Sequence, residues 1–260
     1  MLAAHSPRRL AAVVFVVAST AVRPVAAQQP ASASSPPAVP AAESRPTLAV
    51  LYFTNSALVG GTDYQPLSKG MAEMLITALA QNPGVRVVER DRLQALLEEQ
   101  NLSTSGRVDQ ATAVRVGKVL GAQHLLMGAF VIDPHQTMRI DLRSVNTETS
   151  QIEYVESVTG KADQLLSLVD QLGRKVNTGL RLPPVAIHVR PISEQTAAKA
   201  PEQFRAVMFM SRALERQDRG DKAGAAALYK QALDADPGFE RAKVRLAMLE
   251  SPAAPATSQR

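Results

Sequence analysis

The chain has 260 residues, enough for one medium-sized domain and a small addition, and 45% of them are hydrophobic, which suits a globular core. Tryptophan is absent and only 4% of residues are aromatic, which disfavours sites that stack bases or sugars on aromatic faces. Cysteine is absent too, so stability must come from the packed core, and no cysteine nucleophile is available.

Residues 1–27 have the pattern of a secretion signal peptide. Arg8 and Arg9 supply a positive start, residues 10–21 form an uncharged apolar run, and small residues end at Ala27. The run is too short to span a bilayer, although a retained membrane anchor is an alternative. Removing this segment takes away three of the 29 basic residues and no acidic ones, which leaves 26 against 24 and a net charge of +2. Such a small excess does not indicate a nucleic-acid-binding surface, and no nucleic-acid partner is expected.

Residues 28–46 are rich in Ala, Pro, Ser and Gln and are predicted to be a disordered linker. A bacterial lipoprotein carries a cysteine directly after its cleavage site, where this chain has Gln28. No covalent lipid anchor is therefore expected, and the sequence predicts export to the periplasm, with peripheral contact to the outer membrane as a further possibility.

Apolar periodicity predicts a folded domain over residues 47–182. The fold class is α/β (α+β): a three-layer-like mixed sheet with flanking helices, in the order β-α-β-α-α-β-β-β-α, followed by a small all-α helical hairpin. The predicted elements in chain order are a strand at 47–53 buried on both faces, a helix at 67–79, a strand at 85–88, a helix from 91, a helix at 108–120, strands at 122–132, 138–145 and 152–158, and a helix at 165–180.

The C-terminal part has a different pattern. Residues 183–203 are predicted to be a linker, 204–250 a tetratricopeptide-like helical repeat, and 251–260 a disordered tail. The repeat is indicated by small residues and rings at the spacings of a unit of about 34 residues, namely Ala213, Ala225, Ala232, Phe209 and Tyr229. One such repeat is below the ~3 needed for independent stability, so it is expected to pack on the main domain, on another copy or on a partner.

No residue pattern indicates catalysis, a cofactor or a metal. The histidines that remain after processing, His124, His135 and His188, lack metal-ligand spacing, and no Gly-x-Ser-x-Gly turn is present. The glycine-containing loop at 60–70 lacks the lysine order of a phosphate-binding loop.

Partner contact is the remaining role for exposed residues. Asp63 and Tyr64, in the loop at 54–64, are predicted to contact a protein partner, as are Phe209 and Tyr229 in the repeat. The charge cluster at 89–92 has two interpretations: a recognition site, or a helix start at which Asp91 caps the backbone while Arg90 or Arg92 screens neighbouring acids. The second interpretation is favoured.

These motifs together resemble the CsgG/LpoB/FlgO group of bacterial envelope proteins. The residues that carry the resemblance are 48–53 with Asn55, Gly60 and Gly61, then Leu67, Gly70 and Met71, then 87–90 with Leu93, Leu96, Leu97, Glu99 and Gln100, and finally Gly106, 117–122 and 125–128. The likeness extends over about residues 47–180. It implies a non-catalytic α/β domain of the periplasm or outer membrane whose relatives build curli secretion channels, activate cell-wall synthases, or support flagella and holdfasts.

The resemblance, with the missing cysteine and the short connection between the strands at 138–145 and 152–158, favours a protein-interaction or assembly module over a channel. The expected partners are proteins of the cell envelope, and a homo-oligomer is possible. The alternatives are a subunit of a curli-type outer-membrane secretion channel and a periplasmic sensor of a small ligand or nucleotide.

Overall fold

The computed structural model of the chain describes residues 45–100, 109–184 and 199–251. The predicted signal peptide, nearly all of the linker at 28–46, Gly106, most of the linker at 183–203 with His188, and all but the first residue of the tail lie outside these ranges.

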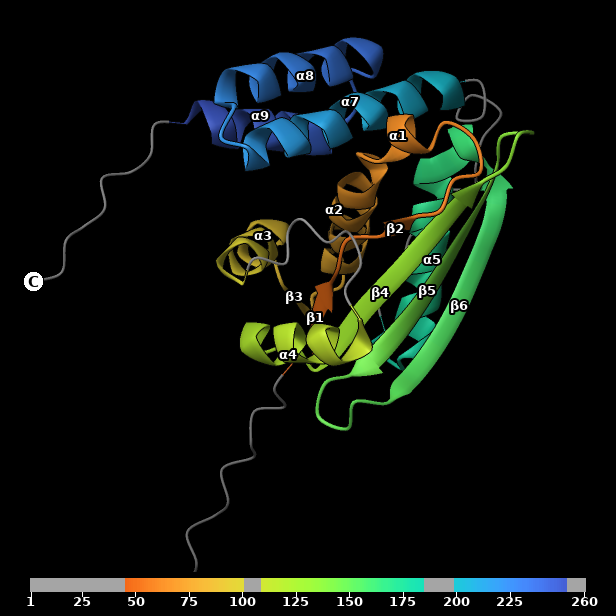
Figure 1. Cartoon of the computed structure of the whole chain (residues 1–260), viewed down its shortest axis with the longest axis vertical. Helices are drawn as coiled ribbons and strands as arrows, with labels where there is room; N and C mark the ends of the chain where they lie inside the picture. The colour runs from red at the N-terminus through yellow and green to blue at the C-terminus, as the bar shows by residue number, and fades with distance from the viewer. Residues whose placement is uncertain (1–44, 101–108, 185–198, 252–260) are drawn as a thin grey trace, which may run out of the picture. The chain divides into compact units, whose positions relative to one another are not determined.

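A mixed six-stranded sheet forms the centre of the described domain (Figure 1). Its strands are β1 (Thr47–Val50), β2 (Thr54–Asn55), β3 (Arg86–Val87), β4 (His124–Ile132), β5 (Thr137–Asn146) and β6 (Ile152–Lys161). The order is β3-β1-β4-β5-β6, and β2 also pairs with β4. Pairing is parallel from β3 to β4 and antiparallel from β4 to β6, so the predicted mixed sheet is confirmed.

Helices cover both faces of the sheet, as predicted. One apolar core joins alternate residues of the strands, such as Leu48 and Leu126, to α2 (Leu67–Ala80) and α5 (Leu165–Gly179). A second core joins the residues that point the other way, such as Ala49 and Leu125, to α3 (Arg90–Glu99) and α4 (Gln110–Leu120). The strands at the centre are therefore buried on both sides.

The predicted strand at 47–53 is divided in two. Pairing stops after Val50, the backbone N–H of Phe53 donates instead to the carbonyl of Ser68 at 3.1 Å, and β2 rejoins β4 at Thr54. The Phe53 ring lies against β4 at Gly128, where a Cβ would stand 2.2 Å from a ring carbon. Only glycine leaves room for that ring.

Three C-terminal helices follow: α7 (Ala200–Asp218), α8 (Lys222–Ala235) and α9 (Glu240–Glu250). α7 begins four residues before the predicted repeat, inside the segment predicted as linker. Apolar residues of α7, including Ala206, Val207 and Met210, belong to the same core as α2 and α5. Of the three possible supports for this part, the main domain is the one observed. The helices are those that the pattern predicts, and their tetratricopeptide identity stays a prediction.

Helices α2 and α7 pack closely at Gly70. A Cβ there would lie 1.9 Å from Ser211 Oγ, and the Ser211 hydroxyl donates to the Val207 carbonyl at 2.7 Å. The two helix backbones can approach this closely because position 70 has no side chain. Gly70, in the first turn of α2, thus permits close packing of the C-terminal helices on the domain.

Candidate partner-binding site

A hollow of 510 Å³ lies where three separate parts of the chain meet. Its walls are the segment around α1 (Gly61–Tyr64), the turn at 133–136 between β4 and β5, and the part of α7 from Phe204 to Arg212. Tyr64 connects them: its ring centroid lies 6.4 Å from that of Phe204, and its hydroxyl donates to Gln136 Oε1 at 3.2 Å. The hollow is therefore built from parts whose relative positions depend on how α7 is held.

A second hollow of 320 Å³ follows along α7. Asp63 and Arg212 line both hollows, so the two share a wall, and we call them together the α7 groove. The second hollow is lined by three arginines, Arg212, Arg216 and Arg219. Arg216 pairs with Asp221 at 3.2 Å and Arg219 with Glu215 at 3.5 Å, whereas Arg212 has no ion pair with any residue that the structure describes.

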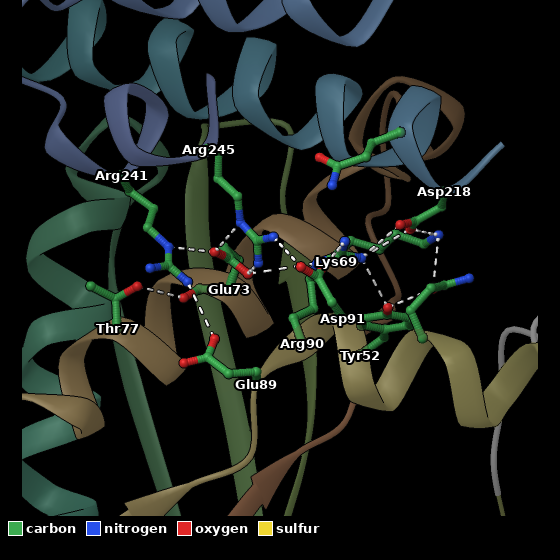
Figure 2. A network of polar contacts seen from close by, with 12 residues as sticks. Tyr52, Lys69, Glu73, Thr77, Glu89, Arg90, Asp91, Asp218, Arg241 and Arg245 are labelled. Carbon is green, nitrogen blue, oxygen red and sulfur yellow. Dashed lines mark hydrogen bonds and ion pairs between the residues drawn. The ribbon is translucent and has the colours of Figure 1, made fainter. Parts of the chain in front are cut away.

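A buried network of charges fixes the end of α7 on the domain (Figure 2). Arg90, only 1% exposed, donates from Nη1 to both carboxylate oxygens of Asp218, at 3.0 and 2.9 Å. It also donates to the Tyr52 hydroxyl at 3.1 Å and from Nη2 to Asp91 at 2.7 Å. Lys69 donates to Asp218 at 2.5 Å. The last residue of α7 thus meets cations from α2 and α3.

The same network continues to α9. Glu73 of α2 is fully buried and accepts two hydrogen bonds from Arg245, at 2.8 and 2.7 Å, and another from Arg241. Arg245 also donates from Nη1 to Asp91 at 2.6 Å. Figure 2 shows Arg241 and Arg245 pointing from α9 toward the carboxylate of Glu73. With Glu89, which lies 3.9 Å from Arg241, four basic and four acidic side chains balance one another.

This pairing shifts two of the acids, Glu73 and Asp91, toward their charged forms. Burial works to raise the pKa of Glu73, but the hydrogen bonds and charges of Arg245 and Arg241 outweigh it and hold that pKa below its usual value. The pKa of Asp91 is lowered in the same way: Arg245 and Arg90 outweigh its burial. Burial raises the pKa of Tyr52, which stays a neutral hydrogen-bond donor to Gln94 at 2.6 Å.

The favoured interpretation of the charge cluster at 89–92 is wrong about the cap. Glu89, not Asp91, holds the N-cap position of α3, and no side chain caps that end. Asp91 does lie in the first turn of α3, and Arg90 pairs with this neighbouring acid at 2.7 Å, as that interpretation expects. Asp91 also binds Arg245, and Arg90 is buried. The cluster joins the domain to the C-terminal helices.

The four predicted partner-binding residues do not come together. Asp63 and Tyr64 line the α7 groove. Phe209 is half-buried and packs on the main core. Tyr229 is fully buried, and its hydroxyl donates to Gln217 at 2.9 Å, so its ring serves the packing of α7 and α8.

Sequence reasoning missed the α7 side of the groove, formed by Phe204, Met208 and Arg212. These residues follow one another at steps of four, so they share one helix face, and that spacing could have identified them. The repeat pattern directed attention to Phe209 and Tyr229 instead.

One group resembles catalytic chemistry in composition but not in arrangement. Glu153 Oε1 lies 2.5 Å from His124 Nδ1 and accepts from Ser144 Oγ at 2.7 Å. A serine nucleophile needs the histidine as its direct partner, and here the carboxylate stands between them. Ser144 is also fully buried. Within residues 45–100, 109–184 and 199–251, no three His, Asp or Glu side chains gather as a metal site would require.

A family model matches part of the chain. Residues 29–132 match the family model described as the curli production assembly/transport component CsgG. The match confirms the predicted resemblance and ends with β4. A search of curated proteins found no significant match. Among the helices that the structure describes, none has the length and apolar character needed to cross a membrane.

Several solved structures are distantly similar. The C-terminal domain of LpoB from Escherichia coli has 16% identity and a TM-score of 0.36, with 45% of this chain and 83% of that one covered. Lipoprotein GNA1162 from Neisseria meningitidis has 12% identity and a TM-score of 0.37, with 52% and 98% covered. A PelC dodecamer from Paraburkholderia phytofirmans has 12% identity and a TM-score of 0.32, with 54% and 90% covered. Similarity at this level carries no argument about function.

Proposed function

We propose that this chain, whose residues 29–132 match the CsgG family model, is a non-catalytic envelope protein that acts as a protein-interaction or assembly module. The proposal includes the predicted export to the periplasm and a protein partner of the cell envelope. The observation that carries it is the α7 groove, an open hollow that contains the predicted contact residues Asp63 and Tyr64.

The groove suits binding rather than turnover. Its lining combines aromatic, methionine and arginine side chains, which are the residue types enriched where proteins contact one another. The histidine, serine and glutamate group described above lies elsewhere, on β4, β5 and β6. The buried charges that hold α7 and α9 give the groove a fixed wall.

Site-specific photo-crosslinking tests the proposal. A photoreactive amino acid replaces Leu58, which is 72% exposed and next to the groove residue Val59, in chain expressed in the envelope of a bacterial host. The matched control replaces Val119, which is 58% exposed on α4. We expect a discrete crosslinked partner from position 58 and none from position 119, and the partner, once identified by mass spectrometry, should bind the purified chain.

Equal crosslinking from both positions, or a captured protein that does not bind the purified chain, would contradict the proposal. A large ring in detergent, measured by size-exclusion chromatography with light scattering, would favour the channel alternative.

A further inference from the structure

The α7 groove has an apolar half and a charged half, which together specify one kind of occupant. We propose that it binds an extended peptide segment of a partner protein in which one residue separates an apolar residue from an acidic one, so that both side chains point to the same face. The inference rests on the proposed function and deepens it, because it states the chemistry of the partner segment and names Arg212 as the residue that binds its acidic side chain.

The apolar half is lined by side chains that remain partly accessible. Val59 is 44% exposed, and Tyr64, Phe204 and Met208 are half-buried around it. Methionine adapts its shape to an incoming side chain, and the two rings offer large rigid surfaces. A volume of 510 Å³ lies in the range of about 300–1,000 Å³ in which ligand sites are found. This half fits one aliphatic or aromatic side chain of a peptide.

The charged half favours an acid. Three arginines line it against two acidic residues, Asp63 and Glu215, which leaves an excess of one positive charge. Arg216 and Arg219 each have an acidic neighbour, while Arg212 has no ion pair among residues 45–100, 109–184 and 199–251. A guanidinium binds a carboxylate through two parallel hydrogen bonds. Arg212 is therefore the group that would hold an acidic side chain.

The apolar and charged halves lie side by side along α7, so one bound peptide segment can contact both. Arg212 lines both hollows, and it lies on the same face of α7 as Phe204 and Met208. When Arg212 holds the acidic residue, the apolar residue two positions away lies toward Met208 and the first hollow. Asp63, on the opposite wall, would repel a second acid there and so favour one orientation of the segment.

Fluorescence anisotropy with defined peptides tests this inference on the full purified chain. The probe is a fluorescein-labelled heptapeptide pool in which two positions hold leucine or phenylalanine and two hold aspartate or glutamate, each acid two residues from an apolar residue. One control pool has lysine in place of the acids, and another has serine in place of the apolar residues. We expect only the first pool to bind.

Three variants locate the binding. Arg212→Glu removes the carboxylate partner, and we expect affinity to fall by about tenfold or more, as loss of a charge-assisted hydrogen bond implies. Val59→Ser should weaken binding through the apolar half. Arg92→Glu makes the same charge reversal at an exposed residue of α3 outside the groove and should leave binding unchanged. Circular dichroism melts confirm that each variant is folded.

Several results would overturn the inference. It is wrong if the lysine pool binds as well as the acidic one, if no pool binds at millimolar concentration, or if Arg212→Glu binds normally. A dimer seen by light scattering that Arg212→Glu abolishes, without peptide binding, would assign the groove to a second copy. Stabilisation by inorganic phosphate alone, dependent on Arg212, would assign it to a free anion. A discrete partner crosslinked at position 58 together with any of these results would leave the proposed function standing and remove only this inference.

Discussion

Arg90 and Asp218 form a buried ion pair although they lie 128 positions apart in the chain. Arg90 begins α3 and Asp218 ends α7, so the pair joins the α/β domain to the C-terminal helices. Their side chains are 1% and 6% exposed. Removing one partner of such a pair leaves the other charge without water, and this costs more than the pair itself contributes.

Asp218→Asn should therefore lower the free energy of unfolding by about 3 kcal/mol, because Arg90 and Lys69 lose the carboxylate that balances them. Urea unfolding followed by circular dichroism measures the change. The control is Asp234→Asn, the same substitution at an exposed position of α8, which should change stability by less than about 0.5 kcal/mol. If the two variants unfold alike, the network does not hold α7.

The stability of the chain should depend on pH through Glu73. Its folded pKa is lowered from the usual 4.5, so the unfolded state binds more protons at pH values between the two. The contribution of Glu73 is fully present above the unfolded pKa and is lost as the pH falls through the folded pKa. Urea unfolding at a series of pH values should show stability falling in acid.

Glu73→Gln distinguishes the contribution of Glu73 to the pH dependence of stability from that of the other acidic residues. The variant should be less stable at neutral pH by about 3–5 kcal/mol, and the difference from the natural chain should narrow as the pH falls below about 4.5. A constant difference across the whole pH range would show that the charge of Glu73 does not provide the stability.

Gly70→Ala should destabilise the chain by about 1–3 kcal/mol, because its Cβ would overlap Ser211 Oγ in a packed interface. Alanine favours a helix more than glycine does, so any loss must come from the contact with α7. Adding Ser211→Gly should restore part of the stability. Gly61→Ala, where a Cβ would meet nothing within 4 Å, is the matched control and should be neutral in thermal melts.

Two substitutions of Tyr229 distinguish a role in core packing from a role in partner contact. Tyr229→Phe removes only the hydrogen bond to Gln217 and should cost about 1 kcal/mol, whereas Tyr229→Ala opens a cavity and should cost about 3–5 kcal/mol. Chemical denaturation measures both. Were Tyr229→Ala to keep full stability but lose a partner, Tyr229 would be a contact residue instead.

Local patterns predicted the elements of this fold because each pattern lies within one element. Alternation of Ile140 and Leu142 with Arg139 and Asp141 is what a strand with one covered face requires, and β5 has that burial. The division of the strand at 47–53 was missed, because it depends on a hydrogen bond to Ser68 of a later helix.

The charge network could not be predicted from the same signals. Arg90 stands next to Asp91, and a local interpretation assigned both to the start of a helix. Their main partners, Asp218 and Arg245, are distant in sequence and become neighbours only after α7 and α9 pack on α2 and α3. Periodicity identifies which face of a helix is covered but not what covers it.

Arg241 and Arg245 of α9, which both donate hydrogen bonds to Glu73, are four residues apart. This spacing is about one helical turn, so both side chains lie on the same face of α9. Inserting a single residue between Arg241 and Arg245 would turn the second guanidinium by roughly 100° about the axis of α9 relative to the first and carry it away from the buried carboxylate. The spacing of the two arginines is thus as strictly constrained as their charges. Variants of the chain that gain or lose one residue within 242–244 should be rare, whereas exchanges of residue type at the exposed Pro237 and Gly238 should be tolerated.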